Sequence, residues 1–221
     1  MARLSYPRAD EPRPEALPPG ERTVGQLVAE SIRLYGQRFW SIVPLGLVFA
    51  GVDLASLGRS ITVQTLVLWV FAPLFAAAYV RACAIALAAQ PPRRAAVNAF
   101  LAALLVFAPF PVLVRVYVLP GIALLALLGL AVPAALVEGL GVRAALRRGA
   151  QLGRADAVHA IGGLATLALV FGVSRYALLV LLHTQGNQTQ DVAAVLSDLV
   201  LSPLLFIGSA LLYVDQAARV K

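Results

Sequence analysis

Six long apolar stretches, separated by short polar or basic segments, constrain this chain more than any other feature of its sequence. A helix that crosses a bilayer needs about 20 predominantly apolar residues, and each stretch is close to that length or exceeds it. The six stretches are Phe39–Leu57, Ile61–Ala89, Val97–Val118, Gly121–Glu138, Ala157–Leu182 and Val192–Asp215. We therefore predict an all-α fold, a polytopic membrane helical bundle with six transmembrane helices.

The composition excludes the other common classes of chain. Hydrophobic residues make up 60% of the 221 residues and charged residues 13%, whereas soluble domains are about 25% charged. These proportions exclude a disordered chain and an ordinary cytosolic enzyme. The single cysteine, Cys83, excludes a disulfide framework and a cysteine-rich metal site, and its apolar surroundings indicate a core residue.

The basic residues predict how the chain is oriented. Of the 18 Arg and Lys residues, 14 fall on one side of the bilayer if there are six spans with both termini on that side. The opposite loops hold only Arg59. Because basic loops stay in the cytosol, we expect cytosolic N- and C-termini. The bias to arginine, which makes up 17 of the 18 basic residues, and the abundance of alanine indicate a GC-rich bacterial genome, so we expect a bacterial inner (plasma) membrane protein. This distribution explains the net charge of +7 without a nucleic-acid partner.

The chain divides into a tail and one membrane domain. Residues 1–20 are rich in proline and are expected to be a disordered cytosolic tail, and residues 21–221 form the six-helix transmembrane domain. Two amphipathic segments, Thr23–Arg38 and Gly141–Arg154, have apolar residues at helical spacing. We predict two cytosolic interfacial helices whose arginines reach anionic headgroups. Packing on the bundle as a cytosolic cap is an alternative that does not exclude the first.

Proline marks two expected interruptions, and Thr23 marks a helix start. Thr23 with Gln26 fits a capping box. The segment Ala108-Pro109-Phe110-Pro111 must distort the third span. The tripeptide Leu119-Pro120-Gly121 predicts the turn between the third and fourth spans.

Ionisable side chains inside the spans are the candidate binding residues. They are Asp53, Arg115, Arg175 and Asp198, and the predicted topology places all four in the outer half of the bilayer. Such residues are costly in a membrane and mark functional sites or structural pairs. Structural ion pairs, a pocket for an anionic or zwitterionic group held by arginine, and snorkelling toward the headgroups all remain open.

A second set of ionisable residues lies toward the inner ends of the spans, where we expect structural roles. This set comprises Arg81, Glu138, Arg154, Asp156 and Asp215. The two histidines, His159 and His183, would be about 36 Å apart along one helix, so they cannot share a metal, and both are expected at the interface. No phosphate loop, His-Glu-x-x-His motif or nucleophile elbow is present in the sequence. We predict that the chain is not an enzyme and has no cofactor or metal.

Short motifs along the chain resemble the glycerophosphodiester phosphodiesterase membrane-domain family. They are Thr23-Val24-Gly25-Gln26-Leu27, Ser31-Ile32-Arg33-Leu34-Tyr35, Arg38-Phe39-Trp40, Leu119-Pro120-Gly121-Ile122, Val137-Glu138-Gly139, Ala144-Ala145-Leu146-Arg147-Arg148, Leu201-Ser202-Pro203-Leu204 and Leu212-Tyr213-Val214-Asp215. The resemblance covers about residues 21–220. In one departure, Gly149 stands where the family usually has serine after the basic pair.

The resemblance implies a membrane domain without the family's catalytic barrel, because a barrel of that type needs about 250 residues and the chain has 221. We expect a non-catalytic integral membrane protein that binds or moves a lipid-like or small amphipathic ligand. The alternative is a structural scaffold or assembly partner of a membrane complex. The expected partners are anionic lipid headgroups on the cytosolic face and, in the alternative, another membrane protein.

Overall fold

The computed structural model describes residues 18–116 and 118–220, with the backbone alone at 114–116. Every regular element in this part of the chain is helical, so the predicted all-α fold is confirmed. The elements are α1 (Val24–Gln37), α2 (Phe39–Ile42), the 3₁₀ helix η1 (Val43–Gly46), α3 (Leu47–Ser56), α4 (Ile61–Ala86), α5 (Arg93–Phe107), α6 (Phe110–Val116), α7 (Val118–Leu128), α8 (Ala131–Val137), α9 (Val142–Ala155), α10 (Ala157–Leu181), α11 (Asn187–Leu201) and α12 (Pro203–Arg219).

Six helical segments are long and apolar enough to cross a membrane, which confirms the predicted number of spans. They are Phe39–Ser56, Ile61–Ala86, Arg93–Leu113, Val118–Val137, Ala157–Leu181 and Asn187–Arg219. The sixth is longer than predicted at both ends and comprises α11 and α12, which meet at Ser202. Pro203 opens α12, in the first turn, where its missing N–H costs nothing.

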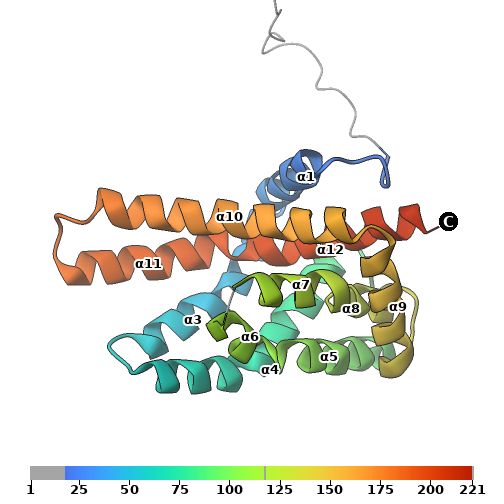
Figure 1. The fold of residues 1–221 in the computed structure, drawn as a ribbon, viewed down its shortest axis with the longest axis horizontal. Coiled ribbons are helices and arrows are strands. Elements are labelled where there is room, and N and C mark those ends of the chain that lie inside the picture. The colour runs from blue at the N-terminus through green and yellow to red at the C-terminus, as the bar shows by residue number, and fades with distance from the viewer. Residues whose placement is uncertain (1–17, 117, 221) are drawn as a thin grey trace, which may run out of the picture.

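The spans run along the long axis of the molecule and alternate in direction (Figure 1). At one end, here called the tip end, lie the α3–α4 loop (57–60) and the α10–α11 loop (182–186). The other end, here called the terminal end, holds the α4–α5 and α8–α9 connections and the C-terminus. Helices α6 and α7 do not extend as far as the tip-end loops (Figure 1).

The prolines interrupt the third span as predicted but do not form the turn that follows it. Helix α5 ends at Phe107 and α6 begins at Phe110, so Pro109 and Pro111 do break the span. Pro120 and Gly121, however, lie inside the first turn of α7, which begins at Val118. The predicted position of the turn was therefore wrong, because proline fits the first turn of a helix as well as it fits a loop.

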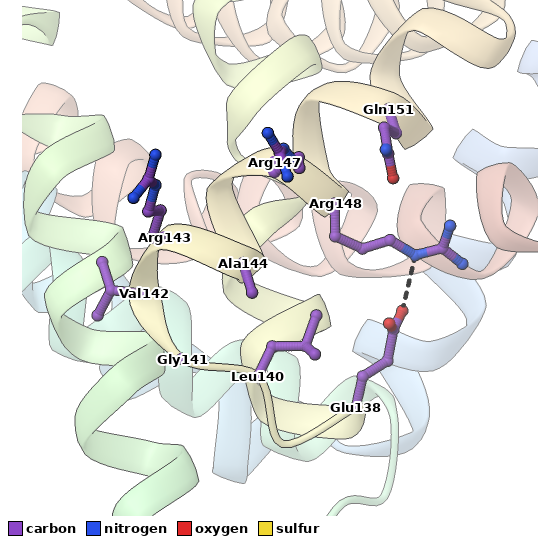
Figure 2. A pocket seen from close by; sticks show the side chains of 9 residues that line it. All are labelled: Glu138, Leu140, Gly141, Val142, Arg143, Ala144, Arg147, Arg148 and Gln151. Atoms are coloured by element: carbon purple, nitrogen blue, oxygen red, sulfur yellow. Dashed lines mark hydrogen bonds and ion pairs between the residues drawn. The ribbon is translucent and has the colours of Figure 1, made fainter.

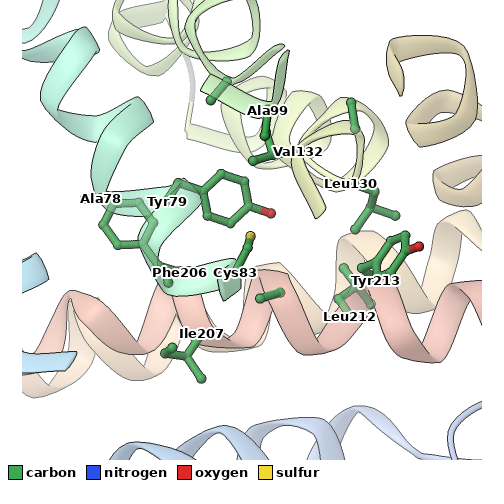
Figure 3. Packing of buried hydrophobic residues seen from close by; sticks show 14 of the residues in the cluster. Ala78, Tyr79, Cys83, Ala99, Leu130, Val132, Phe206, Ile207, Leu212 and Tyr213 are labelled. Atoms are coloured by element: carbon green, nitrogen blue, oxygen red, sulfur yellow. The ribbon is translucent and has the colours of Figure 1, made fainter. Parts of the chain in front are cut away.

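The core packs alanine and branched aliphatic side chains around a few aromatic rings (Figure 3). Tyr79 of α4 is 2% exposed, stacks on Phe206 of α12 with ring centroids 5.9 Å apart, and donates a hydrogen bond to the Gly129 carbonyl. Cys83, one turn further along α4, is fully buried beside them, which agrees with its predicted core role. Alanine is the most frequent residue among the described core positions and lets the helices approach closely.

Both predicted amphipathic helices exist, and both pack on the bundle. In α1, the Thr23–Gln26 capping box is formed, and Leu27 is fully buried, at a position where Gly163 of α10 leaves room for it. Tyr35 Oη donates to the Val200 carbonyl at 2.6 Å. Burial raises the pKa of Tyr35 above its ordinary value, so the phenol stays a neutral donor at physiological pH.

Helix α9 lies across the terminal end, roughly perpendicular to the spans (Figure 1). A Cβ atom at Gly149 would lie 2.4 Å from the Ala131 backbone nitrogen, and one at Gly153 would lie 2.7 Å from Leu127 Cα. Glycine at positions 149 and 153 therefore has a packing reason. The predicted tail, residues 1–20, falls almost entirely on residues 1–17, which lie outside the described residues.

Candidate functional site

Three of the four predicted binding residues come together near the tip end, from three different helices. Arg175 of α10 contacts Asp53 Oδ2 of α3 through one terminal nitrogen and lies 3.4 Å from Asp198 Oδ1 of α11 through the other. We call Asp53, Arg175 and Asp198 the tip cluster. The fourth residue, Arg115, belongs to α6, but its side chain lies outside the described part of the structure.

A close approach of two backbones positions the two carboxylates. A Cβ atom at Gly46, in η1, would lie 2.0 Å from the carbonyl oxygen of Leu199, so only glycine fits there. This contact seats α3 along α11, one residue from Asp198. Nothing in the sequence indicated that Gly46 contacts Leu199, because the two residues are 153 positions apart in the chain.

The tip cluster lines a pocket of about 310 Å³, here called the tip pocket. Its lining residues are Phe49, Val52, Asp53, Ser56, Gln64, Leu68, Phe75, Phe110, Pro111, Phe171, Arg175 and Asp198. The volume lies at the lower end of the range for small-molecule sites, about 300–1,000 Å³. Three charged side chains and four aromatic rings thus share one concave surface.

Burial in the tip cluster is uneven. The side chain of Asp198 is 2% exposed, while those of Asp53 and Arg175 are 25% and 30% exposed. Asp198 Oδ1, Arg175 Nε and Ser56 Oγ are buried without a hydrogen bond to any described residue. Buried polar atoms normally have a partner, so these three atoms leave donor and acceptor capacity at the pocket wall.

A second polar network lies at the terminal end and is structural in character. Arg22, just before α1, pairs with the fully buried Asp215 at 3.2 Å. Arg219 pairs with Asp156 at 2.6 Å and donates to the carbonyl of Arg22 at 3.0 Å. The network ties the start of α1 to α12 and to the start of α10.

The sequence-based expectations for this network were only partly correct. His159, expected at the interface, is 8% exposed, and its Nε2 lies 3.8 Å from Asp215 Oδ2. The reason is that its ring faces Asp215 and Arg219 of α12. Arg81 and Arg154, predicted for this set, are exposed and make no ion pair with the described residues. Among those residues, no group of three or more His, Cys, Asp or Glu is placed to hold a metal.

The exposed side of α9 borders a groove of about 920 Å³. Arg148 pairs with Glu138 at 3.2 Å, and Tyr213 donates to the same carboxylate oxygen at 2.8 Å. Figure 2 shows Arg148 turned toward Glu138, whereas Arg143 and Arg147 extend away from it. Within the described residues Arg143 and Arg147 make no ion pair, so their charges are available to a partner.

No family model, curated protein or solved structure matches this chain. The resemblance to the glycerophosphodiester phosphodiesterase membrane-domain family therefore stays a prediction from the motifs. What the chain does must be argued from its own geometry.

Proposed function

We propose that this integral membrane protein is non-catalytic and binds or moves a lipid-like or small amphipathic ligand in the tip pocket. The observation that carries the proposal is that Asp53, Arg175 and Asp198 line a pocket of about 310 Å³ together with four phenylalanines. Small-molecule sites have this character, an apolar wall with a few polar groups that fix the ligand's orientation.

Charges kept in the outer parts of membrane spans support the same proposal. A pair that served only to join helices would be expected to satisfy its hydrogen bonds, because a half-satisfied buried network is unfavourable. The tip cluster leaves Asp198 Oδ1 and Arg175 Nε without a hydrogen bond to the described residues. A bound polar group would satisfy both atoms, and its apolar remainder would pack against Phe49 and Phe171.

We also propose that the protein lies in a bacterial inner membrane with both termini in the cytosol. In this orientation the terminal end faces the cytosol and the tip pocket lies toward the outside. The arginines of α9 then lie beside the inner leaflet, where anionic headgroups attract them by about 1 kcal/mol each. Neutralising substitutions in α9 test this part through the lipid dependence of thermal stability.

The pocket is tested by filling it. The Ser56→Trp substitution places a large side chain in the pocket wall, whereas Ser174→Trp adds the same side chain to an exposed position of α10. Native mass spectrometry of each variant, purified from bacterial membranes in a mild detergent, reports the small molecules it retains. We expect wild type and Ser174→Trp to retain a bound mass that Ser56→Trp loses.

Identical bound masses in all three proteins, or none in any, would contradict a ligand in the tip pocket. The scaffold alternative would then gain support if a membrane protein co-purified in fixed ratio and was lost on deletion of α1. The melting temperature of each variant is compared with that of wild type to check that the tryptophan leaves the fold intact.

A further inference from the structure

The tip pocket contains a buried acceptor, Asp198 Oδ1, that no described residue hydrogen-bonds. Asp198 is 2% exposed, and its Oδ1 has no hydrogen bond to any described residue. Its nearest described cation, Arg175, is 3.4 Å away, beyond the usual length of about 2.7–2.9 Å for a charged N–H···O bond. A buried carboxylate oxygen in this state favours a ligand that donates a hydrogen bond.

The guanidinium of Arg175 is already engaged on both sides. One terminal nitrogen contacts Asp53 and the other faces Asp198. An anionic ligand would have to displace one of these carboxylates or use Nε alone. Among the side chains that the structure describes in the lining, two carboxylates face one guanidinium, so a cationic donor is better matched than an anion.

The apolar wall points to the same chemistry. Phe49 packs edge-on against Phe75, with ring centroids 4.8 Å apart, and lies 6.2 Å from Phe171. Phe110 completes the aromatic lining. The faces of aromatic rings attract ammonium groups, by about 0.5–2 kcal/mol according to desolvation. Carboxylates beside several aromatic rings are therefore suited to an organic cation.

We propose that the tip pocket binds the ammonium group of a small amphipathic amine, with Asp198 and Asp53 accepting its hydrogen bonds and the phenylalanines holding its apolar body. This inference rests on the proposed function and names the class of its ligand. It replaces the anionic or zwitterionic group considered from the sequence, because two carboxylates already face Arg175.

Three isosteric probes distinguish the charge that the pocket prefers. Phenethylamine, 2-phenylethanol and 3-phenylpropionate carry a cationic, a neutral and an anionic group on similar apolar bodies. Binding of each is measured by calorimetry to the full chain in nanodiscs of zwitterionic phosphatidylcholine, with empty nanodiscs as the blank. We expect phenethylamine to bind about tenfold more tightly than the other two, which is the effect of one charged hydrogen bond.

Matched variants locate the binding. Asp198→Asn and Asp53→Asn each remove a carboxylate from the pocket and are expected to weaken phenethylamine binding about tenfold or more. Asp191→Asn makes the same change at an exposed position of α11 and is expected to leave binding unchanged. Asp53→Asn, at a side chain 25% exposed, keeps the test valid if Asp198→Asn does not fold.

Each other outcome overturns the inference in a recognisable way. Tighter or equal binding of 3-phenylpropionate or 2-phenylethanol, lost in Ser56→Trp, would refute the amine but leave a ligand pocket. Binding of phenethylamine that survives both aspartate substitutions would show partition into the bilayer and refute the site. No binding of any probe, together with no retained mass in native mass spectrometry, would refute the proposed function as well.

Discussion

Gly46 determines whether the tip cluster can form. Its hydrogen occupies a gap in which a Cβ atom would lie 2.0 Å from the Leu199 carbonyl oxygen, and the three nearest atoms all belong to the Leu199 backbone. We expect Gly46→Ala to push η1 away from α11, which separates Asp53 from Asp198 and costs about 1–3 kcal/mol of stability, as overpacking does. Differential scanning fluorimetry in detergent measures the loss as a lower melting temperature.

Gly172→Ala is the matched control for Gly46→Ala. A Cβ atom at Gly172, on the exposed side of α10, would meet nothing within 4 Å, so alanine should leave stability unchanged or raise it by about 0.5–1 kcal/mol. Equal melting temperatures for Gly46→Ala and wild type would mean that η1 and α11 are not held at this separation.

Single residues also show what the sequence could and could not predict. Asp53, Arg175 and Asp198 were predictable as candidates because a charge inside an apolar run stands out. Their contact was only a hypothesis, since periodicity does not show which helices are neighbours. Arg22 gave no signal, because one arginine in a basic terminal segment looks like any other, and its partner Asp215 is 193 residues away.

Helix α9 is the element where packing and charge are most clearly separated. Gly149 and Gly153, four residues apart, face α7 and α8, while Arg143 and Arg147, also four apart, are exposed. The glycines let the helix lie flat across the ends of the spans, and the arginines extend from the opposite side. This arrangement is typical of a helix at a membrane interface.

The double substitution Arg143→Gln, Arg147→Gln tests the role proposed for α9. In wild type we expect phosphatidylglycerol, added to phosphatidylcholine nanodiscs, to raise the melting temperature. Removing two arginines should reduce that stabilisation by about 2 kcal/mol, at about 1 kcal/mol for each residue near an anionic surface. The Glu138–Arg148 pair is left in place so that the fold of the α8–α9 connection is retained.

Arg59→Gln is the comparison for the α9 variant, because it removes a basic charge from the loop at the tip end. It should keep nearly all of the stabilisation by phosphatidylglycerol. If the α9 double variant responds to phosphatidylglycerol as wild type does, the arginines do not bind headgroups, and α9 serves only as a cap on the bundle.

Elements were predictable where one local rule decided them, and not where two rules competed. The capping box of α1 and the break at Pro109 follow from local chemistry. The turn between the third and fourth spans did not follow, because Pro120 suits both a loop and the first turn of α7.

At the scale of the whole molecule, the tip pocket and the basic helix α9 lie at opposite ends. The tip pocket lies between the α3–α4 and α10–α11 hairpins, beside the start of α6 (Figure 1). The terminal end instead carries α9 and the buried network around Asp215. If the positive-inside rule sets the orientation, the pocket opens away from the cytosol and would receive its ligand from outside.

Cysteine accessibility tests this orientation. Cys83 is fully buried and can be replaced by alanine to give a background without a reactive thiol. We expect Ser60→Cys and Asn187→Cys, both at the tip end, to react with a membrane-impermeant maleimide in intact bacteria. Gln90→Cys, in the α4–α5 connection at the terminal end, should react only after the cells are permeabilised.

The labelling pattern tests the orientation of the chain and also whether the two hairpins end on the same side of the membrane. Reaction of Gln90→Cys alone in intact cells would reverse the orientation and place the tip pocket in contact with the cytosol, so that its ligand would have to come from there. Reaction of Ser60→Cys without Asn187→Cys would mean that the two hairpins end on opposite sides. The tip cluster could not then form, because Asp53 and Asp198 belong to different hairpins and meet only when both tips lie at the same end.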